Sequence, residues 1–235
     1  MNPHLPRVLT DGTALIVPLF GSPQSLPEKI AQARESGADV VEWRADLSED
    51  WESCAAVLAD ADVPVIATLR TDREGGAFAG RGEDYLTAVT MLLAAKPDLI
   101  DVEINRSAAY RAIALARSSG VPVIASHHNF DMTPRNDDIL EILQAMVEAD
   151  ADILKIAFQP LTPDDTWRHM ELSRSLTGRF GRPIISISMG DDAAWTRLAA
   201  KACGSAATFA SLGEGSAPGQ IDASLVRGVL DALGR

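Results

Sequence analysis

Lys155 is the residue whose type and surroundings point most directly to chemistry. It interrupts the apolar run at 153–158, and an ammonium group is rarely buried in a protein without a partner or a task. One interpretation is an ion pair with Asp101 or Glu103. The other is a Schiff-base lysine, because burial and neighbouring arginines favour the free amine that attacks a carbonyl group. A histidine opposite this lysine favours the second interpretation.

Two adjacent histidines, His127 and His128, end another apolar run. Side chains alternate along a strand, so only one of them can face the same side as Lys155, and either could be an ordinary core histidine. Adjacent histidines on a strand point apart and no H-x-H or HExxH spacing is present, which speaks against a metal site. Glu74, before Gly75 and Gly76, marks either a simple turn or a carboxylate that fixes the tautomer of an imidazole.

Further polar residues gather where apolar runs end. Because side chains alternate along a strand, the two members of each of these pairs lie on the same face of their strand: Glu42 with Arg44, Thr68 with Arg70, Asp101 with Glu103, and Ser126 with His128. If the faces meet, a cationic pocket forms from Arg44, Arg70, Lys155 and His128. On a protein of net charge −12, such a pocket predicts a small anionic ligand.

The elements that would position these residues alternate regularly along the chain. Strands are predicted at 15–20, 40–46, 64–70, 99–104, 121–128, 153–158, 183–189 and 207–212. Helices are predicted between them at 26–36, 52–61, 85–95, 108–119, 138–149, 164–176, 193–203 and 224–233. Nearly unbroken apolar strands that alternate with amphipathic helices indicate a parallel sheet, and eight such units predict a closed (β/α)₈ barrel. An open doubly wound sheet is the competitor, but no glycine-rich fingerprint follows the first strand.

Local patterns add three further expectations. Asp137–Asp138 and Thr162–Asp165 resemble helix starts, with a capping side chain and acids near the positive end of the helix dipole. The segment 211–220 holds three glycines and a proline, which suits either a phosphate-binding loop or a mobile lid. In a barrel of this kind, all these polar residues would meet at the carboxyl ends of the strands.

Composition excludes several classes of protein. The chain has 235 residues, 46% of them hydrophobic and 23% charged, and its net charge of −12 opposes binding to nucleic acid. No window approaches the roughly 18 apolar residues of a membrane span, and the N-terminus lacks a signal-peptide pattern, which predicts a cytoplasmic protein without a membrane partner. Cys54 and Cys203 suggest neither a disulfide framework nor a zinc ribbon. We expect one domain over 1–235, with 1–12 as a loosely specified lead-in.

Eight pieces of sequence, in order along the chain, together resemble the type I 3-dehydroquinate dehydratase family. They are Glu42–Trp43–Arg44, Arg70 with Glu74–Gly75–Gly76, Ser126 and His128 with Phe130 and Thr133–Pro134, Lys155–Ile156–Ala157, Ser188–Met189, Thr196–Arg197, Thr208–Phe209, and Ser216 through Gln220. The resemblance implies a (β/α)₈ TIM barrel, with a short N-terminal β-hairpin at its bottom as a further option. It also implies a dimer without metal or cofactor that dehydrates 3-dehydroquinate to 3-dehydroshikimate, in the shikimate pathway to aromatic amino acids, through an imine.

The resemblance also implies roles for individual residues. Lys155 would form the imine, His128 would be the general acid and base, and Glu74 would orient His128. The substrate would be contacted by the remaining residues: Glu42, Arg44 and Arg70 at its hydroxyl groups, Arg197 at its carboxylate, Met189 and Phe209 as apolar walls, and Ser216, Ala217 and Gln220 from a closing loop.

The sequence departs from the family pattern at Pro18, Asn129, Ile187 and the segment 191–196, which affects the expected substrate contacts but none of the three catalytic residues. Two other functions stay open. A class I aldolase also uses a barrel lysine, but it would need a phosphate site after the seventh and eighth strands. A small-molecule-binding barrel without activity is the second, although intact Lys155, His128 and Glu74 speak against it.

Overall fold

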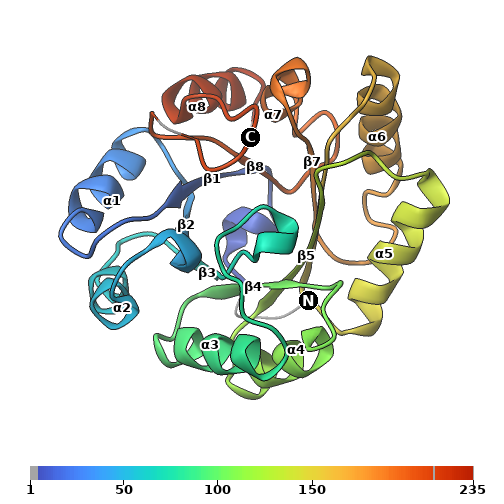
Figure 1. The fold of residues 1–235 in the computed structure, drawn as a ribbon. Helices are drawn as coiled ribbons and strands as arrows, with labels where there is room; N and C mark the ends of the chain where they lie inside the picture. The colour runs from blue at the N-terminus through green and yellow to red at the C-terminus, as the bar shows by residue number, and fades with distance from the viewer. Residues whose placement is uncertain (1–4, 214, 235) are drawn as a thin grey trace.

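The computed structural model describes residues 5–213 and 215–234, which fold into alternating strands and helices. Figure 1 shows the helices as a ring around the strands. The strands are β1 (Ala14–Leu19), β2 (Val40–Arg44), β3 (Val65–Thr68), β4 (Leu99–Glu103), β5 (Val123–Asn129), β6 (Ile153–Phe158), β7 (Ile184–Ser188) and β8 (Ala207–Phe209). Each lies within its predicted range or within one residue of it.

The strands form one parallel sheet that closes on itself. Ladders run in the order β7-β6-β5-β4-β3-β2-β1-β8. Between β7 and β8, the backbone N–H of Ala206 donates to the carbonyl of Ile184 at 2.8 Å, and the N–H of Ser186 donates to Ser205 Oγ at 3.0 Å. The (β/α)₈ barrel is therefore confirmed, and the open sheet is not formed.

The helices follow the predicted pattern with one clear exception. They are α1 (Leu26–Glu35), α2 (Trp51–Ala59), α3 (Glu83–Ala94), α4 (Ala109–Ser118), α5 (Asn136–Glu148), α6 (Pro163–Ser175), α7 (Trp195–Leu198) and α8 (Ala223–Ala232). The helix predicted at 193–203 is wrong in length, because α7 covers one turn after the short 3₁₀ helix η4 (Asp191–Ala193). The hydroxyl of Thr208 donates to the carbonyl of Arg197 at 2.9 Å, and this bond takes the acceptor that a longer helix would use.

Both predicted helix starts are confirmed, with acids in the first turn of α5 and of α6, but only α6 has the predicted capping side chain. Thr162 caps α6, accepting from the N–H of Asp165, whose carboxylate accepts from the N–H of Thr162 in return. Asp137 and Asp138 lie in the first turn of α5, but no side chain caps that helix. None of the helices in the described part of the chain is long and apolar enough to cross a membrane.

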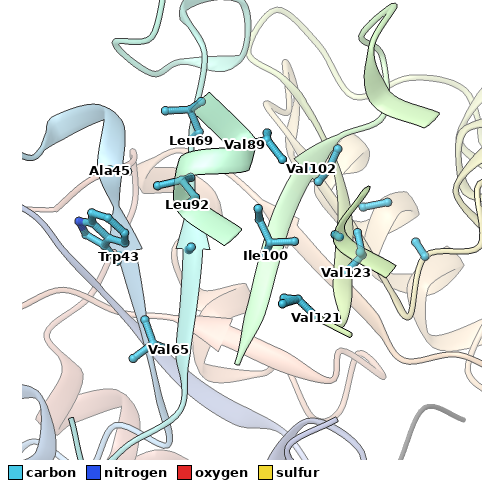
Figure 2. Close-up of a cluster of buried hydrophobic side chains, with 14 of the residues drawn as sticks. Trp43, Ala45, Val65, Leu69, Val89, Leu92, Ile100, Val102, Val121 and Val123 are labelled. Carbon is cyan, nitrogen blue, oxygen red and sulfur yellow. The ribbon is translucent and has the colours of Figure 1, made fainter. Parts of the chain in front are cut away.

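Two apolar layers stabilise the barrel. The outer layer lies between strands and helices, and Figure 2 shows part of it, including Leu92 of α3, Val65 of β3 and Ile100 of β4. The inner layer lies within the barrel and includes Ile16 and Leu99, both fully buried. Complete burial of a side chain of this size contributes roughly 1.5–3 kcal/mol.

The N-terminal segment adds to the inner layer. The 3₁₀ helix η1 (Arg7–Leu9), drawn in violet-blue near the centre of Figure 1, lies across the barrel axis. Its Leu9 is fully buried and packs with residues from the beginnings of the strands. The β-hairpin considered for this position is wrong for the described residues 5–13, because a single helical turn brings Leu9 into the opening. Residues 1–4 of the predicted lead-in lie outside the described residues.

Candidate active site

A pocket of about 490 Å³, counting its part open to solvent, lies at the carboxyl ends of the strands. Every residue predicted for the site lines this pocket: Glu42, Arg44, Arg70, Glu74, His128, Lys155, Met189, Arg197, Phe209, Ser216, Ala217 and Gln220. Four further residues line the pocket that were given no role in the site from the sequence, although they stand in its motifs or departures: Gly75, Phe130, Ala157 and Ile187. The structure therefore brings the predicted set together, while the role of each residue stays a prediction.

Lys155 lies on β6 and is 4% exposed. Its Nζ atom is 3.1 Å from Asp101 Oδ2 and 3.4 Å from Glu42 Oε1, and it lies 4.5 Å from the centre of the Phe209 ring. The ion-pair interpretation is thus confirmed for Asp101 and wrong for Glu103, which binds arginines instead. The ion pairs hold the amino group at the base of the pocket, and the lysine releases a proton before it can attack a carbonyl group.

Arg70 links several buried carboxylates below the pocket. One nitrogen of its guanidinium is 2.8 Å from Asp101 Oδ1, and the other is 3.2 Å from Glu103 Oε1 and 3.0 Å from Ser126 Oγ. Burial alone would raise the pKa of Asp101, but the charges of Arg70 and Lys155 outweigh it and lower this pKa to about 2. Asp101 is therefore an anion at every pH at which the enzyme would work.

Arg44 also has an acidic partner of its own. Its guanidinium donates two hydrogen bonds to Asp46, at 2.9 and 2.7 Å, and the same carboxylate accepts the backbone N–H groups of Arg70 and Ala77. The predicted cationic pocket is consequently wrong in its electrostatics. Arg44, Arg70 and Lys155 meet as expected, but each of them pairs with a buried carboxylate.

The end of β3 brings Glu74 to the histidine pair. Glu74 ends the 3₁₀ helix η3 (Asp72–Glu74), and Gly75 follows with φ = 81°. A Cβ atom at Gly76 would lie 2.1 Å from the carbonyl oxygen of Arg70, so this tight loop requires glycine. Both interpretations of this motif hold, since it is a turn and it also places a carboxylate beside an imidazole.

Glu74 Oε2 is 2.9 Å from His128 Nδ1 and also accepts the backbone N–H of His128 at 2.9 Å. Burial acts to raise the pKa of Glu74, but the hydrogen bonds from His127 and His128 act in the opposite direction and outweigh it. The pKa of Glu74 is therefore below its usual value. The carboxylate therefore stays ionised and accepts the Nδ1 proton, which leaves the lone pair of His128 on Nε2. Alternation predicts that only one of the two histidines faces the pocket, and the structure shows that this one is His128, the residue that the family resemblance indicated.

The protonation of His128 follows from its surroundings. Burial and the nearby charges of Arg70 and Lys155 lower its pKa well below the usual value, although Glu74 acts in the opposite direction. His128 is thus a neutral imidazole at neutral pH. A neutral imidazole with its free lone pair toward the pocket can accept a proton from a bound molecule.

Arg197 differs from the other cations of the pocket. Its guanidinium donates to three backbone carbonyls, those of Gly219 at 2.7 Å, Pro218 at 2.9 Å and Phe209 at 3.4 Å. Within residues 5–213 and 215–234, no carboxylate forms an ion pair with it, and burial lowers its pKa to about 10. Arg197 is therefore a buried cation whose charge an anionic ligand can neutralise.

The loop at 211–220 lies beside Arg197. Gln220 Oε1 accepts the N–H of Ser216 at 2.8 Å, which closes a compact turn over the pocket. The predicted segment includes Glu214, which lies outside the described residues. The predicted mobility of the loop stays a prediction.

Asp46 and Asn105 are the polar residues near the site whose positions the sequence did not reveal. Asp46 lies two residues after Arg44, and alternation alone does not show that its side chain folds back on the guanidinium. Asn105 follows β4 in a short loop and lies 3.0 Å from His127 Nδ1. In the described part of the chain, no group of three or more His, Cys, Asp or Glu residues has the arrangement of a metal site.

A parallel (β/α)₈ barrel whose mouth holds a buried lysine and a carboxylate-bound histidine defines a class of barrel enzymes that act on carbonyl compounds. The particular family follows from comparison with known proteins. The family model described as type I 3-dehydroquinase matches residues 15–235.

Individual relatives agree with this match. The chain is 35% identical over 231 residues to a 3-dehydroquinate dehydratase of Listeria monocytogenes, covering 93% of this chain and 92% of the relative. It is 34% identical to one of Neisseria gonorrhoeae, covering 94% and 92%. The chain therefore belongs to the type I 3-dehydroquinase family, which are lyases, as predicted.

Solved structures of the family have the same fold. A type I 3-dehydroquinate dehydratase from Clostridium difficile, with covalently modified comenic acid, has a TM-score of 0.83 at 29% identity, covering 94% of this chain and 92% of that one. The enzyme from Geobacillus kaustophilus has a TM-score of 0.85 at 28% identity, covering 94% and 91%.

Proposed function

We propose that this chain dehydrates 3-dehydroquinate to 3-dehydroshikimate and water in the shikimate pathway, through an imine on Lys155. The observation that carries the proposal is the buried Lys155 in the same pocket as the Glu74-bound His128. Family membership identifies the substrate, and the pocket supplies the groups that this reaction needs.

The lysine supplies an electron sink. The Lys155 ammonium group first releases a proton, and the free amine attacks the C3 ketone. The proton returns to the oxygen that leaves as water, and a protonated imine forms. The positive nitrogen withdraws electrons, so the neighbouring C2 proton can be removed near neutral pH. Asp101 and Glu42 hold the amino group at the base of the pocket, and Phe209 covers it from one side.

His128 moves the protons of the elimination. Its Nε2 atom takes the C2 proton, and the resulting imidazolium returns a proton to the departing hydroxyl group. Glu74 stabilises this transient cation, because its carboxylate already accepts the Nδ1 proton. Hydrolysis of the product imine then regenerates the free lysine.

The remaining residues bind the substrate. Arg197 pairs with the substrate carboxylate, since it is a buried cation to which none of the described carboxylates is paired. Glu42, Arg44 and Arg70 contact the hydroxyl groups, while Met189 and Phe209 form the apolar walls. Ser216, Ala217 and Gln220 close over the ligand and keep water away from the imine.

The aldolase alternative needs a phosphate site at the ends of β7 and β8. A Cβ atom at Gly219 would lie 2.3 Å from the carbonyl oxygen of Gly190, so these two backbones are in contact. This contact leaves little room for a phosphate group there, and it favours a carboxylate at Arg197.

The test is a direct assay of the purified protein with 3-dehydroquinate, followed by the ultraviolet absorbance of the conjugated product. We expect turnover in the wild-type protein and none above background in Lys155→Ala. A folded wild-type protein without turnover would exclude this function.

We further propose a homodimer in the cytoplasm. The dimer rests on the family resemblance, and the location rests on the sequence pattern described above. Light scattering of the eluted protein measures the mass directly, and a value near the 25.0 kDa of one chain would contradict the dimer.

A further inference from the structure

We propose that His127 is a positioning residue that acts through Glu74 to hold the catalytic His128. This inference rests on the proposed function, since it assigns a task to the histidine that does not line the pocket. His127 and His128 point to opposite faces of β5, yet both lie within reach of the same carboxylate.

The end of the sheet explains how one carboxylate reaches both faces. The register of β4 and β5 ends where Glu103 pairs with Ser126, whereas β5 continues along β6 to Asn129. The backbone N–H of His128 therefore lies on a free strand edge, and Glu74 Oε2 accepts it at 2.9 Å. A carboxylate seated on a strand edge lies between the two faces of that strand.

Each oxygen of Glu74 faces one histidine. Oε2 is 2.9 Å from His128 Nδ1, and Oε1 is 3.5 Å from His127 Nδ1. The Glu74 side chain is only 7% exposed, and His127 is the one donor to Oε1 among the described residues. A buried carboxylate oxygen without a donor is costly, so His127 stabilises the orientation in which Oε2 serves His128.

The His127 ring is itself held in place. Its edge packs on Phe158 at a centroid distance of 5.9 Å, and the Asn105 amide lies 3.0 Å from the same Nδ1 atom. The amide and the carboxylate compete for this nitrogen. Asn105 Nδ2 is the amide atom nearest to Nδ1. We assign the proton to Nδ1 because a carboxylate is the stronger acceptor, and this assignment requires the flipped orientation of the Asn105 amide, in which its oxygen shares that proton.

Without the His127 imidazole, Glu74 Oε1 would lose its hydrogen-bond donor, and the carboxylate could rotate. Arg70 Nη1 lies 3.8 Å from Glu74 Oε2, so an unrestrained Glu74 can turn toward this cation and away from His128. Lys155 has other partners, Asp101 and Glu42. Imine formation should therefore continue while the proton transfer steps become slower.

The test compares His127→Phe with His127→Asn in the assay described above. Phenylalanine keeps the ring on Phe158 but removes the nitrogen, and asparagine restores an N–H donor. We expect His127→Phe to lower kcat by about 10-fold or more with little change in KM. A fall of this size is typical of losing one hydrogen bond to a charged group. Borohydride trapping of the imine should stay at the wild-type level, and His127→Asn should recover most of kcat.

A second pair of variants shows whether the effect passes through Glu74. In a Glu74→Gln background, His127→Phe should add less than about 2-fold, because coupled residues are not additive. A purely structural role of the ring would give the same loss in both backgrounds. If phenylalanine proves too bulky to fold, His127→Ala makes the same comparison.

Two results would overturn the inference: a wild-type kcat in His127→Phe, or an equal loss in the presence and absence of Glu74. Neither result touches the proposed function, which fails if the folded wild-type protein itself shows no turnover. The two failures are therefore distinguishable within one set of assays.

Discussion

The two sides of the pocket hold their positive charges in different ways. On the side formed by β2 to β6, Arg44, Arg70 and Lys155 each pair with a carboxylate within 3.2 Å. On the side formed by β7, β8 and the loop at 211–220, Arg197 contacts only backbone carbonyls in the described residues. The protein thus neutralises the cations of one side and leaves the charge of the other side to a ligand.

The paired charges serve the chemical step, and the charge of Arg197 serves substrate binding. Paired charges keep Lys155 and its neighbours in one arrangement, because removing either member of a buried pair is strongly unfavourable. Arg197 instead gains a carboxylate partner only when an anion enters, so its interaction contributes to affinity. We therefore expect variants of Lys155 and His128 on the first side to change mainly kcat, and variants of Arg197 on the second side to change mainly KM.

Lys155→Ala should show the largest effect. Without the amine no imine forms, and we expect turnover to fall by about 10⁴-fold or more, as for other covalent catalysts. The assay is steady-state turnover, with circular dichroism as a control that the barrel is folded. Substantial remaining activity would mean that the paired side does not carry the chemistry.

His128→Ala should come next. Elimination should slow by about 10²–10⁴-fold, the range typical of a positioned acid and base, while the imine still forms. The low pKa of His128 adds a pH test. Because the base must be unprotonated, the rate of elimination from the preformed imine should hold its value as the pH falls through 6.5 and decline only below it. A decline that begins above pH 6.5 would contradict the role of burial.

Arg197→Ala should affect binding more than chemistry. The loss of a charge-assisted pair predicts a rise in KM of about 10–100-fold with a smaller change in kcat. Arg197→Lys is the matched control, since it keeps the charge but not the two-pronged geometry, and should lie between the two. An unchanged KM in Arg197→Ala would place the anion site elsewhere.

Metal removal should have the smallest effect. The imine supplies the electron sink without a metal, so incubation with EDTA should leave turnover unchanged. Added zinc or magnesium should not raise it. A large loss that a divalent cation restores would contradict the imine as the sole electron sink.

Local patterns in the sequence were sufficient for most of the barrel. Each predicted apolar run forms a strand in the structure, because a short apolar run between turn residues can be recognised from neighbouring residues alone. Alternation correctly placed Glu42 with Arg44 and Ser126 with His128. Lys155 was recognisable because a charge inside an apolar run requires an explanation.

Contacts between distant segments were not predictable in the same way. The pairing of Asp46 with Arg44 also involves the loop after β3, and the end of α7 is bound by Thr208 of the next strand. The segment of η1 gives no hint that its Leu9 enters the barrel. The expectation of a cationic pocket failed for the same reason, since counting charges does not reveal how they pair.

Borohydride trapping tests the central claim most directly. The protein is incubated with 3-dehydroquinate, reduced with borohydride and mapped by peptide mass spectrometry, together with His128→Ala and Lys155→Ala. We predict a reduced adduct on Lys155 in the wild-type and His128→Ala proteins and none in Lys155→Ala. An adduct on another lysine, or no adduct in active wild-type protein, would contradict the imine at Lys155.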